Sequence, residues 1–93
     1  MKVILINEDN HGQIGVALNY YNAVTWLIGN NWISDYTEVW DDDRTNWCAL
    51  KELLGEDWAD DMVNNWDIDN FNEFWNYSFQ LTLVEVIGTE EAG

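Results

Sequence analysis

Short apolar runs separated by polar turns predict a mixture of strands and helices along this chain. Residues 2–6 are apolar on both alternating faces, which is typical of a strand at the centre of a sheet. After a polar turn at 8–12, residues 14–17 are expected to return as a second strand. Alternation predicts a short strand over 36–40, and the β-branched residues of 79–87 predict a closing strand.

Four helices are expected between these strands. Asn19 is a suitable N-cap for a helix over 20–28, which Gly29 and Asn30 would end. The second helix is expected to be capped by Thr45 and to end at Gly55, with one apolar face made of Trp47, Leu50, Leu53 and Leu54. The third is expected over 56–66, with an inward face made of Trp58, Ala59, Met62, Val63 and Trp66. The fourth is a short helix capped by Asp69. The pattern predicts one α+β domain over residues 1–93, with a small, mostly antiparallel sheet of three to four strands built from both termini and packed with about four short helices.

Charge is distributed unevenly along the 93 residues, which carry 18 acidic side chains against three basic ones, a formal net charge of −15. Residues 10–34 and 74–84 contain no Asp, Glu, Lys or Arg, whereas 35–73 hold thirteen acids against Arg44 and Lys51. This charge argues against direct binding of nucleic acid and of anionic membranes, since both need clustered basic residues. Seven tryptophans also exclude a disordered acidic tail, which would lack aromatic residues.

Cysteine content and hydropathy point to the cytoplasm. Cys48 is the only cysteine, so no internal disulfide can form. The apolar run at 3–6 is too short for a signal peptide, and no run approaches the roughly 18 apolar residues of a membrane span. We therefore expect a soluble protein of a reducing cytoplasm.

Carboxylates gather in the middle of the chain in a way that solubility alone does not require. Asp57, Asp60 and Asp61 share one face of the expected third helix, where like charges repel and no Lys or Arg offsets them. A duplex as long as a domain of this size carries about 20 phosphates, which is of the same order as this net charge. The expected partner is a basic nucleic-acid-binding protein, and the candidate contact residues are Asp41, Asp42, Asp43, Glu56, Asp57, Asp60, Asp61, Asp67 and Asp69.

Two alternatives use other features of the sequence. The helix over 20–28 is apolar around most of its circumference, which would suit a scaffolding protein or homodimer that associates through Tyr20, Tyr21, Val24 and Trp26. The segment 41–52 has partial calcium-loop spacing, with Asp41, Asp43, Thr45 and Glu52 as side-chain ligands and the carbonyl of Trp47 between them. Asn46 stands where such a loop expects glycine.

Catalysis has little support in the sequence. His11 is the only histidine and lies in an expected exposed turn, and Cys48 is surrounded by negative charge, which disfavours a reactive thiolate. No glycine-rich phosphate loop is present. We expect no enzymatic activity, no cofactor and no metal ion.

Three features give the chain a general resemblance to a known class of proteins. They are its size, the acidic stretch 35–73 and the opening pattern Val3-Ile4-Leu5-Ile6-Asn7-Glu8-Asp9-Asn10-His11-Gly12. The chain resembles the small acidic proteins of phages and mobile elements, among them DNA-mimicking anti-restriction and anti-CRISPR inhibitors. The resemblance implies that carboxylates are presented to the Arg- and Lys-lined DNA site of a host nuclease, in the cytoplasm of the host. It assigns no role to individual residues, and the many tryptophans and the neutral segment 10–34 are departures from it.

Overall fold

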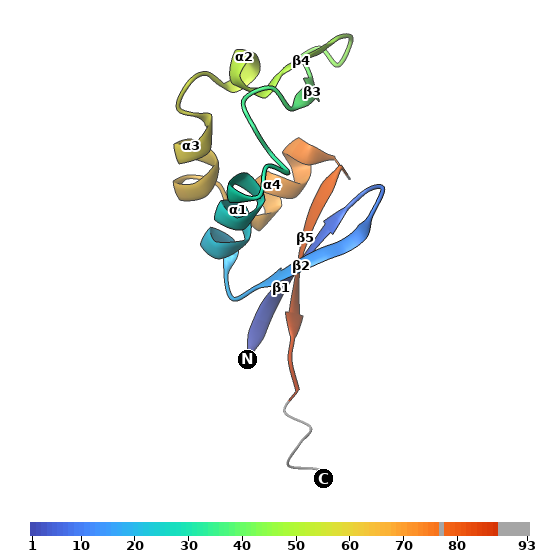
Figure 1. Cartoon of the computed structure of the whole chain (residues 1–93), viewed down its shortest axis with the longest axis vertical. Coiled ribbons are helices and arrows are strands. Elements are labelled where there is room, and N and C mark those ends of the chain that lie inside the picture. Colours follow the sequence, from blue (N-terminus) through green and yellow to red (C-terminus); the bar gives the residue numbers. More distant parts are fainter. Residues whose placement is uncertain (77, 88–93) are drawn as a thin grey trace.

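The chain combines helices with antiparallel strands (Figure 1), which confirms the predicted α+β class. The computed structural model describes residues 1–76 and 78–87. The elements within those ranges are β1 (Lys2–Glu8), β2 (Gly12–Ala17), α1 (Tyr20–Gly29), β3 (Glu38–Trp40), β4 (Trp47–Ala49), α2 (Leu50–Leu54), α3 (Trp58–Asn64), α4 (Ile68–Trp75) and β5 (Phe79–Glu85).

The strand at the amino terminus, β1, is the centre of the main sheet. Its neighbours are β2 on one side and β5 on the other, both antiparallel, so the sheet joins the two ends of the described chain. Ile4 and Ile6 are buried on its inner face, and Ile6 lies opposite the buried Leu81 of β5. The predicted central position of the first strand is therefore confirmed.

α1 and α4 pack against this sheet, and α3 packs against α1. Ala23, Val24 and Leu27 of α1 and Phe71 of α4 are fully buried in the shared core. The hydroxyl of Tyr20 donates to the carbonyl oxygen of Met62 at 2.6 Å, which ties α1 to α3. No helix in the described ranges has both the length and the apolar character needed to cross a bilayer.

Asn72 attaches α4 to the outer edge of β5. Its side-chain amide donates to the carbonyl oxygen of Leu81 at 2.9 Å and accepts from the Leu81 backbone N–H at 2.8 Å. These two bonds are the pair that a neighbouring strand would make with Leu81. The helix that leads into β5 therefore also covers part of its free edge.

The structure corrects the predicted second helix. Trp47 lies in β4, opposite Trp40 of β3, and α2 begins only at Leu50. Thr45 caps no helix, because its backbone N–H donates to the carboxylate of Asp41 at 3.0 Å and closes the hairpin turn. Strand pairing between residues that lie close in the chain has overridden a helical spacing of apolar residues.

Helix ends differ from the prediction by a few residues elsewhere. Asn19 caps α1 as predicted, accepting from the N–H of Asn22 at 2.8 Å. The cap of α4 is Asp67 and not Asp69, since the Asp67 carboxylate accepts from the N–H of Asn70 at 2.8 Å. The predicted helix over 56–66 is shorter at both ends, because α3 spans Trp58–Asn64 and Asp57 is its N-cap residue.

The Tyr20 hydroxyl leads to a prediction about alkaline stability. Burial, followed by the negative charge of Asp67, raises the pKa of Tyr20 above its ordinary value. Above about pH 10 the unfolded chain releases this proton while the folded chain keeps it, so stability falls as the pH rises. Replacing Tyr20 by Phe is expected to reduce that fall, at a cost of about 1 kcal/mol near neutral pH for the lost hydrogen bond.

Urea unfolding at neutral pH and above about pH 10, followed by tryptophan fluorescence, measures this effect. The control is Tyr21→Phe, because Tyr21 lies on the exposed side of the same helix. It should show the wild-type dependence on pH. Equal pH dependence in Tyr20→Phe and wild type would contradict the prediction.

Candidate functional site in the β3–β4 hairpin

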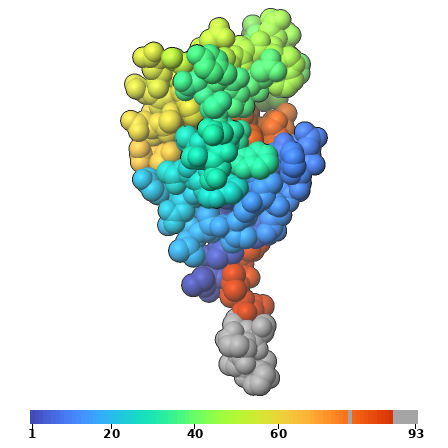
Figure 2. Space-filling model, in the orientation of Figure 1, coloured from blue at the N-terminus to red at the C-terminus, as the bar shows by residue number. Residues whose placement is uncertain are grey.

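The β3–β4 hairpin ends in a pair of stacked tryptophans. Trp40 and Trp47 form the last pair of the ladder, and their ring centroids lie 4.2 Å apart with 25° between the planes. Their exposed fractions are 42% and 55%. The hairpin lies at the opposite end of the molecule from the start of β1 (Figure 1 and Figure 2). The exposed fractions show that the stack presents a large aromatic surface to solvent.

The loop 41–46 between the two strands is held by Asp41. Its carboxylate accepts hydrogen bonds from the backbone N–H groups of the loop, and the bond from Thr45 is the main cause of its lowered pKa. Arg44 has a φ of 57°, a left-handed conformation that the turn requires. Asp42 and Asp43 are exposed at the tip.

The calcium alternative does not match this geometry. The Asp41 carboxylate is directed into its own loop, and the Glu52 carboxylate accepts from the Ala49 N–H at 3.3 Å at the start of α2. Asp43 and Thr45 lie in the same hairpin turn. Among residues 1–76 and 78–87, no three His, Cys, Asp or Glu side chains are grouped so as to hold a metal ion.

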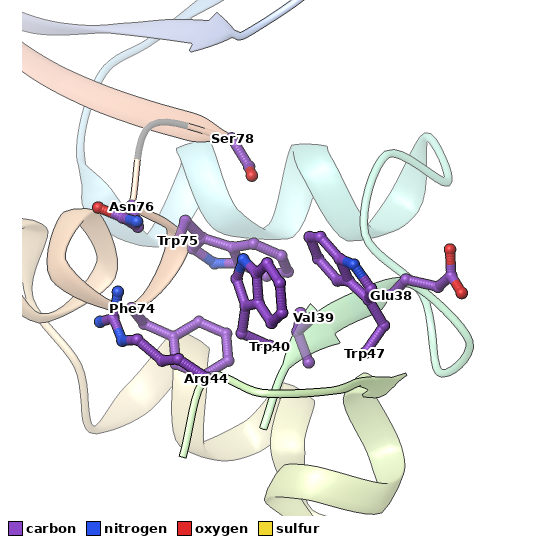
Figure 3. Close-up of a pocket in the computed structure, with 9 residues that line it drawn as sticks. All are labelled: Glu38, Val39, Trp40, Arg44, Trp47, Phe74, Trp75, Asn76 and Ser78. Atoms are coloured by element: carbon purple, nitrogen blue, oxygen red, sulfur yellow. The ribbon is translucent and has the colours of Figure 1, made fainter. Parts of the chain in front are cut away.

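A cavity of about 90 Å³ lies between the hairpin and the end of α4. We call it the aromatic cavity, and its aromatic walls are Trp40, Trp47, Phe74 and Trp75. Figure 3 shows Arg44 and Asn76 at one end and Ser78 above the Trp75 ring, while the carboxylate of Glu38 is directed away from the group. Residues from the hairpin, α4 and the start of β5 therefore form one small site.

Trp75 lines this cavity, and its buried indole N–H has no hydrogen-bond partner among the described residues. Its exposed fraction is 4%, and its Nε1 is the one buried side-chain nitrogen or oxygen of the described residues without a hydrogen-bond partner. Trp58 is equally buried, but its Nε1 donates to the Asp35 carboxylate at 2.7 Å. A buried donor without an acceptor costs stability, about 1 to 3 kcal/mol, and such groups are rare in folded proteins.

A second hollow, of about 540 Å³, lies beside the aromatic cavity and shares Arg44 with it. Asp41 and Asp42 line it from the hairpin, and Glu73 lines it from α4. Arg44 takes part in none of the three ion pairs that the described residues form. Three carboxylates therefore surround one arginine, and the local charge stays negative.

The predicted α3 carboxylates, Asp57, Asp60 and Asp61, are all exposed. Asp61 accepts from the side-chain amide of Asn65 at 2.9 Å, and Asp60 lines a groove of about 340 Å³ between α1 and α3. This groove shares no residue with the two hollows beside the hairpin. The predicted acidic face thus consists of two parts, one on the hairpin and one on α3.

The other predicted acids have local roles or are free. Glu56 lies 3.5 Å from the ammonium group of Lys51. Asp67 caps α4, as described above. Asp69 lies exposed in the first turn of the same helix. Glu73 was not among the predicted contact residues and joins the hairpin acids through tertiary packing.

The predicted oligomer surface on α1 is mostly inside the molecule. Val24 has an exposed fraction of 0%, so it cannot contact a second copy. Tyr20 and Trp26 are partly buried against the core, which leaves Tyr21 as the exposed member of the set. The sheet and α3 cover most of the apolar surface of α1 that the sequence analysis assigned to a second copy.

His11 and Cys48 do not form a reactive pair in this arrangement. The His11 ring lies 2.6 Å from the Glu8 carboxylate, and this hydrogen bond is the main cause of the lowered pKa of Glu8. Burial raises the pKa of the Cys48 thiol, and nearby carboxylates, Glu52 first, add to that rise. The thiol is therefore held in its unreactive protonated form at neutral pH.

Sequence reasoning missed the aromatic cavity and Arg44. Trp40 and Trp47 flank a polar stretch of six residues, and that symmetry is a hairpin signal that could have identified their pairing. The approach of Trp75 to this hairpin has no such signal. It depends on packing between segments far apart in the chain.

The chain was also compared with known proteins. No family model, curated protein or solved structure matches it.

Proposed function

We propose that the protein is a non-catalytic inhibitor that binds a basic nucleic-acid-binding protein and occupies its nucleic-acid site. The observation that carries this proposal is the unpaired surface charge. Sixteen acidic residues lie in the described ranges, and the three ion pairs use only Glu8, Glu56 and Glu85 among them. Thirteen carboxylates of the described chain therefore lie outside any ion pair.

The charge is high enough to compete with a duplex. A domain of this length spans about 32 to 35 Å, and duplex DNA of that length carries about 20 phosphates. The formal net charge of the chain is −15. Carboxylates accept the guanidinium group of arginine in the bidentate geometry that phosphates also offer.

The stacked tryptophans support the same function in a different way. Sites that bind single-stranded nucleic acid combine basic side chains with aromatic residues that stack on bases. Trp40 and Trp47 present stacked rings, and the exposed Asp42 and Asp43 lie in the loop that joins their strands, so aromatic and acidic groups come from one hairpin. Indole faces also attract the guanidinium group of arginine. The hairpin therefore offers aromatic surfaces for stacking and carboxylates for basic side chains within a few residues.

The alternative of a scaffolding protein that associates through α1 has less support, because Val24 is buried and Tyr21 alone of the proposed set is exposed. The host nuclease and the cytoplasmic location implied by the resemblance remain part of the proposal. The target itself can be found by capture on the immobilised protein, with elution by duplex DNA. A target that duplex DNA does not release would contradict the proposed competition.

Replacing Asp57, Asp60 and Asp61 together by Asn tests the contribution of α3. Target binding is expected to weaken about 3- to 150-fold, since each of the three exposed ion pairs contributes about 0.2 to 1 kcal/mol. Thermal stability should stay constant or rise, because the change removes repulsion between neighbours on one helix face. Calorimetric titration and thermal unfolding measure the two effects.

The matched control replaces the same three residues by Glu, which keeps the charge and changes the reach. If charge is what the target recognises, this variant should bind within a few-fold of wild type. Undiminished binding of the Asn variant would exclude α3 from the contact. Loss of stability in the Asn variant would make these residues structural.

A further inference from the structure

We infer that two adjoining hollows beside the end of α1 each hold one long basic side chain, an arginine or a lysine, of the target protein. One is the groove of about 340 Å³ between α1 and α3, and the other is a hollow of about 370 Å³ that we call the Tyr36 hollow. Ile28 lines both of them. The identity of the target rests on the proposed function, whereas the choice of a basic side chain rests on the walls of the two hollows.

The walls of the groove come from one stripe of residues on each helix. α1 and α3 pack side by side (Figure 1), and Tyr21, Thr25 and Ile28 line the groove from α1 at the spacing of one helix face. Ala59 and Val63 lie one turn apart on α3 and are half-buried. The hydroxyl of Thr25 already donates to the carbonyl oxygen of Tyr21 at 2.8 Å. The walls of the groove are therefore largely apolar.

One carboxylate lies at the rim of this groove. Asp60 lines the groove directly after the wall residue Ala59, and it lies nearly opposite the buried Trp58 around the axis of α3. It is exposed and takes part in no ion pair among the described residues. No basic residue lines the groove. A side chain with an apolar stem and a cationic end matches both the walls and the rim.

The Tyr36 hollow repeats this combination of an apolar wall and a carboxylate. Ile28, Ile33 and Trp58 line it, together with Asp35 and Tyr36, and no basic residue does. Trp58 fixes the Asp35 carboxylate in place, because its Nε1 donates to Oδ1 of Asp35 at 2.7 Å. The second oxygen of that carboxylate has no hydrogen-bond partner among the described residues. Tyr36 is exposed to 78%, so the face of its ring is open to a cation.

Size and charge argue against other kinds of side chain. Both volumes lie near the lower end of the range of about 300 to 1,000 Å³ for ligand pockets, so each hollow suits one long side chain. An acidic side chain would be repelled by the carboxylate of either hollow. A purely apolar side chain would remove water from that carboxylate without replacing its hydrogen bonds. Arginine and lysine avoid both costs, and the net charge of −15 attracts them.

Three small probes test this inference without any target protein. They are n-propylguanidinium, which has the shape of an arginine side chain, n-propylurea, which is its neutral counterpart, and methylguanidinium, which keeps the cation but lacks most of the stem. The readout is the side-chain signals of the isotope-labelled protein in NMR spectra. The Ile28 methyl groups report on both hollows, the Tyr21 ring reports on the groove and the Tyr36 ring reports on the Tyr36 hollow.

n-Propylguanidinium should shift these three signals in a saturable way and bind about three- to tenfold more tightly than either of the other probes. The internal control is Leu83, which is exposed on β5 and lines neither hollow, so its methyl signals should not move. Equal or tighter binding of n-propylurea would mean that the charge is not recognised. Equal or tighter binding of methylguanidinium would mean that the apolar walls contribute nothing. Either result, or no saturable shift, would overturn the inference.

Asp60→Asn and Asp69→Asn form a matched pair of variants. Each removes one charge from an exposed position on a helix, but Asp69 lies on α4 and lines neither hollow. Asp60→Asn should weaken binding of n-propylguanidinium about two- to fivefold at the Tyr21 signal and leave the affinity at the Tyr36 signal unchanged. Asp69→Asn should bind like wild type at both signals. Equal weakening in the two variants would assign the effect to the general negative field and overturn the inference.

The two proposals can fail separately. Failure of n-propylguanidinium to bind leaves the carboxylates of the hairpin available for the salt-dependent contact with the target. Failure of duplex DNA to release the target would contradict the proposed function and leave the probe result in place. The probe experiment and the competition experiment therefore report on different properties of the protein.

Discussion

Target binding is expected to weaken about 100-fold when the salt concentration is raised from about 50 mM to about 200 mM. Proteins that contact six to ten DNA phosphates lose about 10³ to 10⁵ in affinity over that range. The protein's formal net charge of −15 is somewhat below the roughly 20 phosphate charges of a duplex as long as a compact domain of this size. Its dependence on salt should therefore be steep and somewhat below that of DNA. Calorimetric titrations at several salt concentrations give the slope.

Trp40→Ala separates the charged contact from the aromatic one. Removing an exposed tryptophan at the centre of an interface typically costs about 2 kcal/mol or more at every salt concentration. This variant should bind more weakly than wild type with an unchanged slope. The Asn variant of α3 should instead have a shallower slope. Affinity of the wild-type protein that does not vary with salt would exclude nucleic-acid mimicry.

Replacing Phe71 by Ala is expected to destabilise the fold by about 3 to 5 kcal/mol. Phe71 is fully buried in α4, with its ring at 6.3 Å from that of Tyr20 and 6.0 Å from that of Trp75. It is the contact through which α4, α1 and the cavity wall share one core. A domain of this length has about 5 to 14 kcal/mol of stability in total, so the loss is a large part of it.

Thermal unfolding followed by tryptophan fluorescence should place the midpoint of Phe71→Ala at least about 12 °C below wild type. Tyr36→Ala is the control, because Tyr36 is exposed and should change stability by no more than about 0.5 kcal/mol. A similar midpoint for both variants would mean that Phe71 is not central to the core. Retained stability in Phe71→Ala would require the neighbouring rings to fill the void.

The sheet and α1 could be predicted because their signals are local and strong. Residues 2–6 are apolar on both faces, and Asn19 stands directly before an apolar helical stretch. The segment 45–54 could not be predicted in the same way. Trp47, Leu50 and Leu54 fit a helical period, but the pairing of Trp47 with Trp40 makes the first part of that segment a strand. The spacing of apolar residues describes one segment only, so it holds no information on the strand with which that segment pairs.

Only part of the candidate site could be predicted from the sequence, again because some of its features depend on contacts between distant segments. Exposure of Asp42, Asp43 and the carboxylates of α3 follows from the sequence, since charged side chains are rarely buried. Their separation into two groups does not, because it depends on how the hairpin and α3 lie in the fold. The unmet N–H of Trp75 is visible only when every nearby acceptor is known.

Asn72 has a consequence for the behaviour of the protein in concentrated or salty solutions. An exposed sheet edge is a template on which another chain can assemble, and many proteins protect such edges with charge. Salt screens charge, so this kind of protection fades under those conditions. The amide of Asn72 occupies both backbone groups of Leu81 by hydrogen bonding, which salt screens far less. The hydrogen bonds of Asn72 therefore protect the middle of β5 from pairing with another strand, and this protection does not depend on the acidic surface.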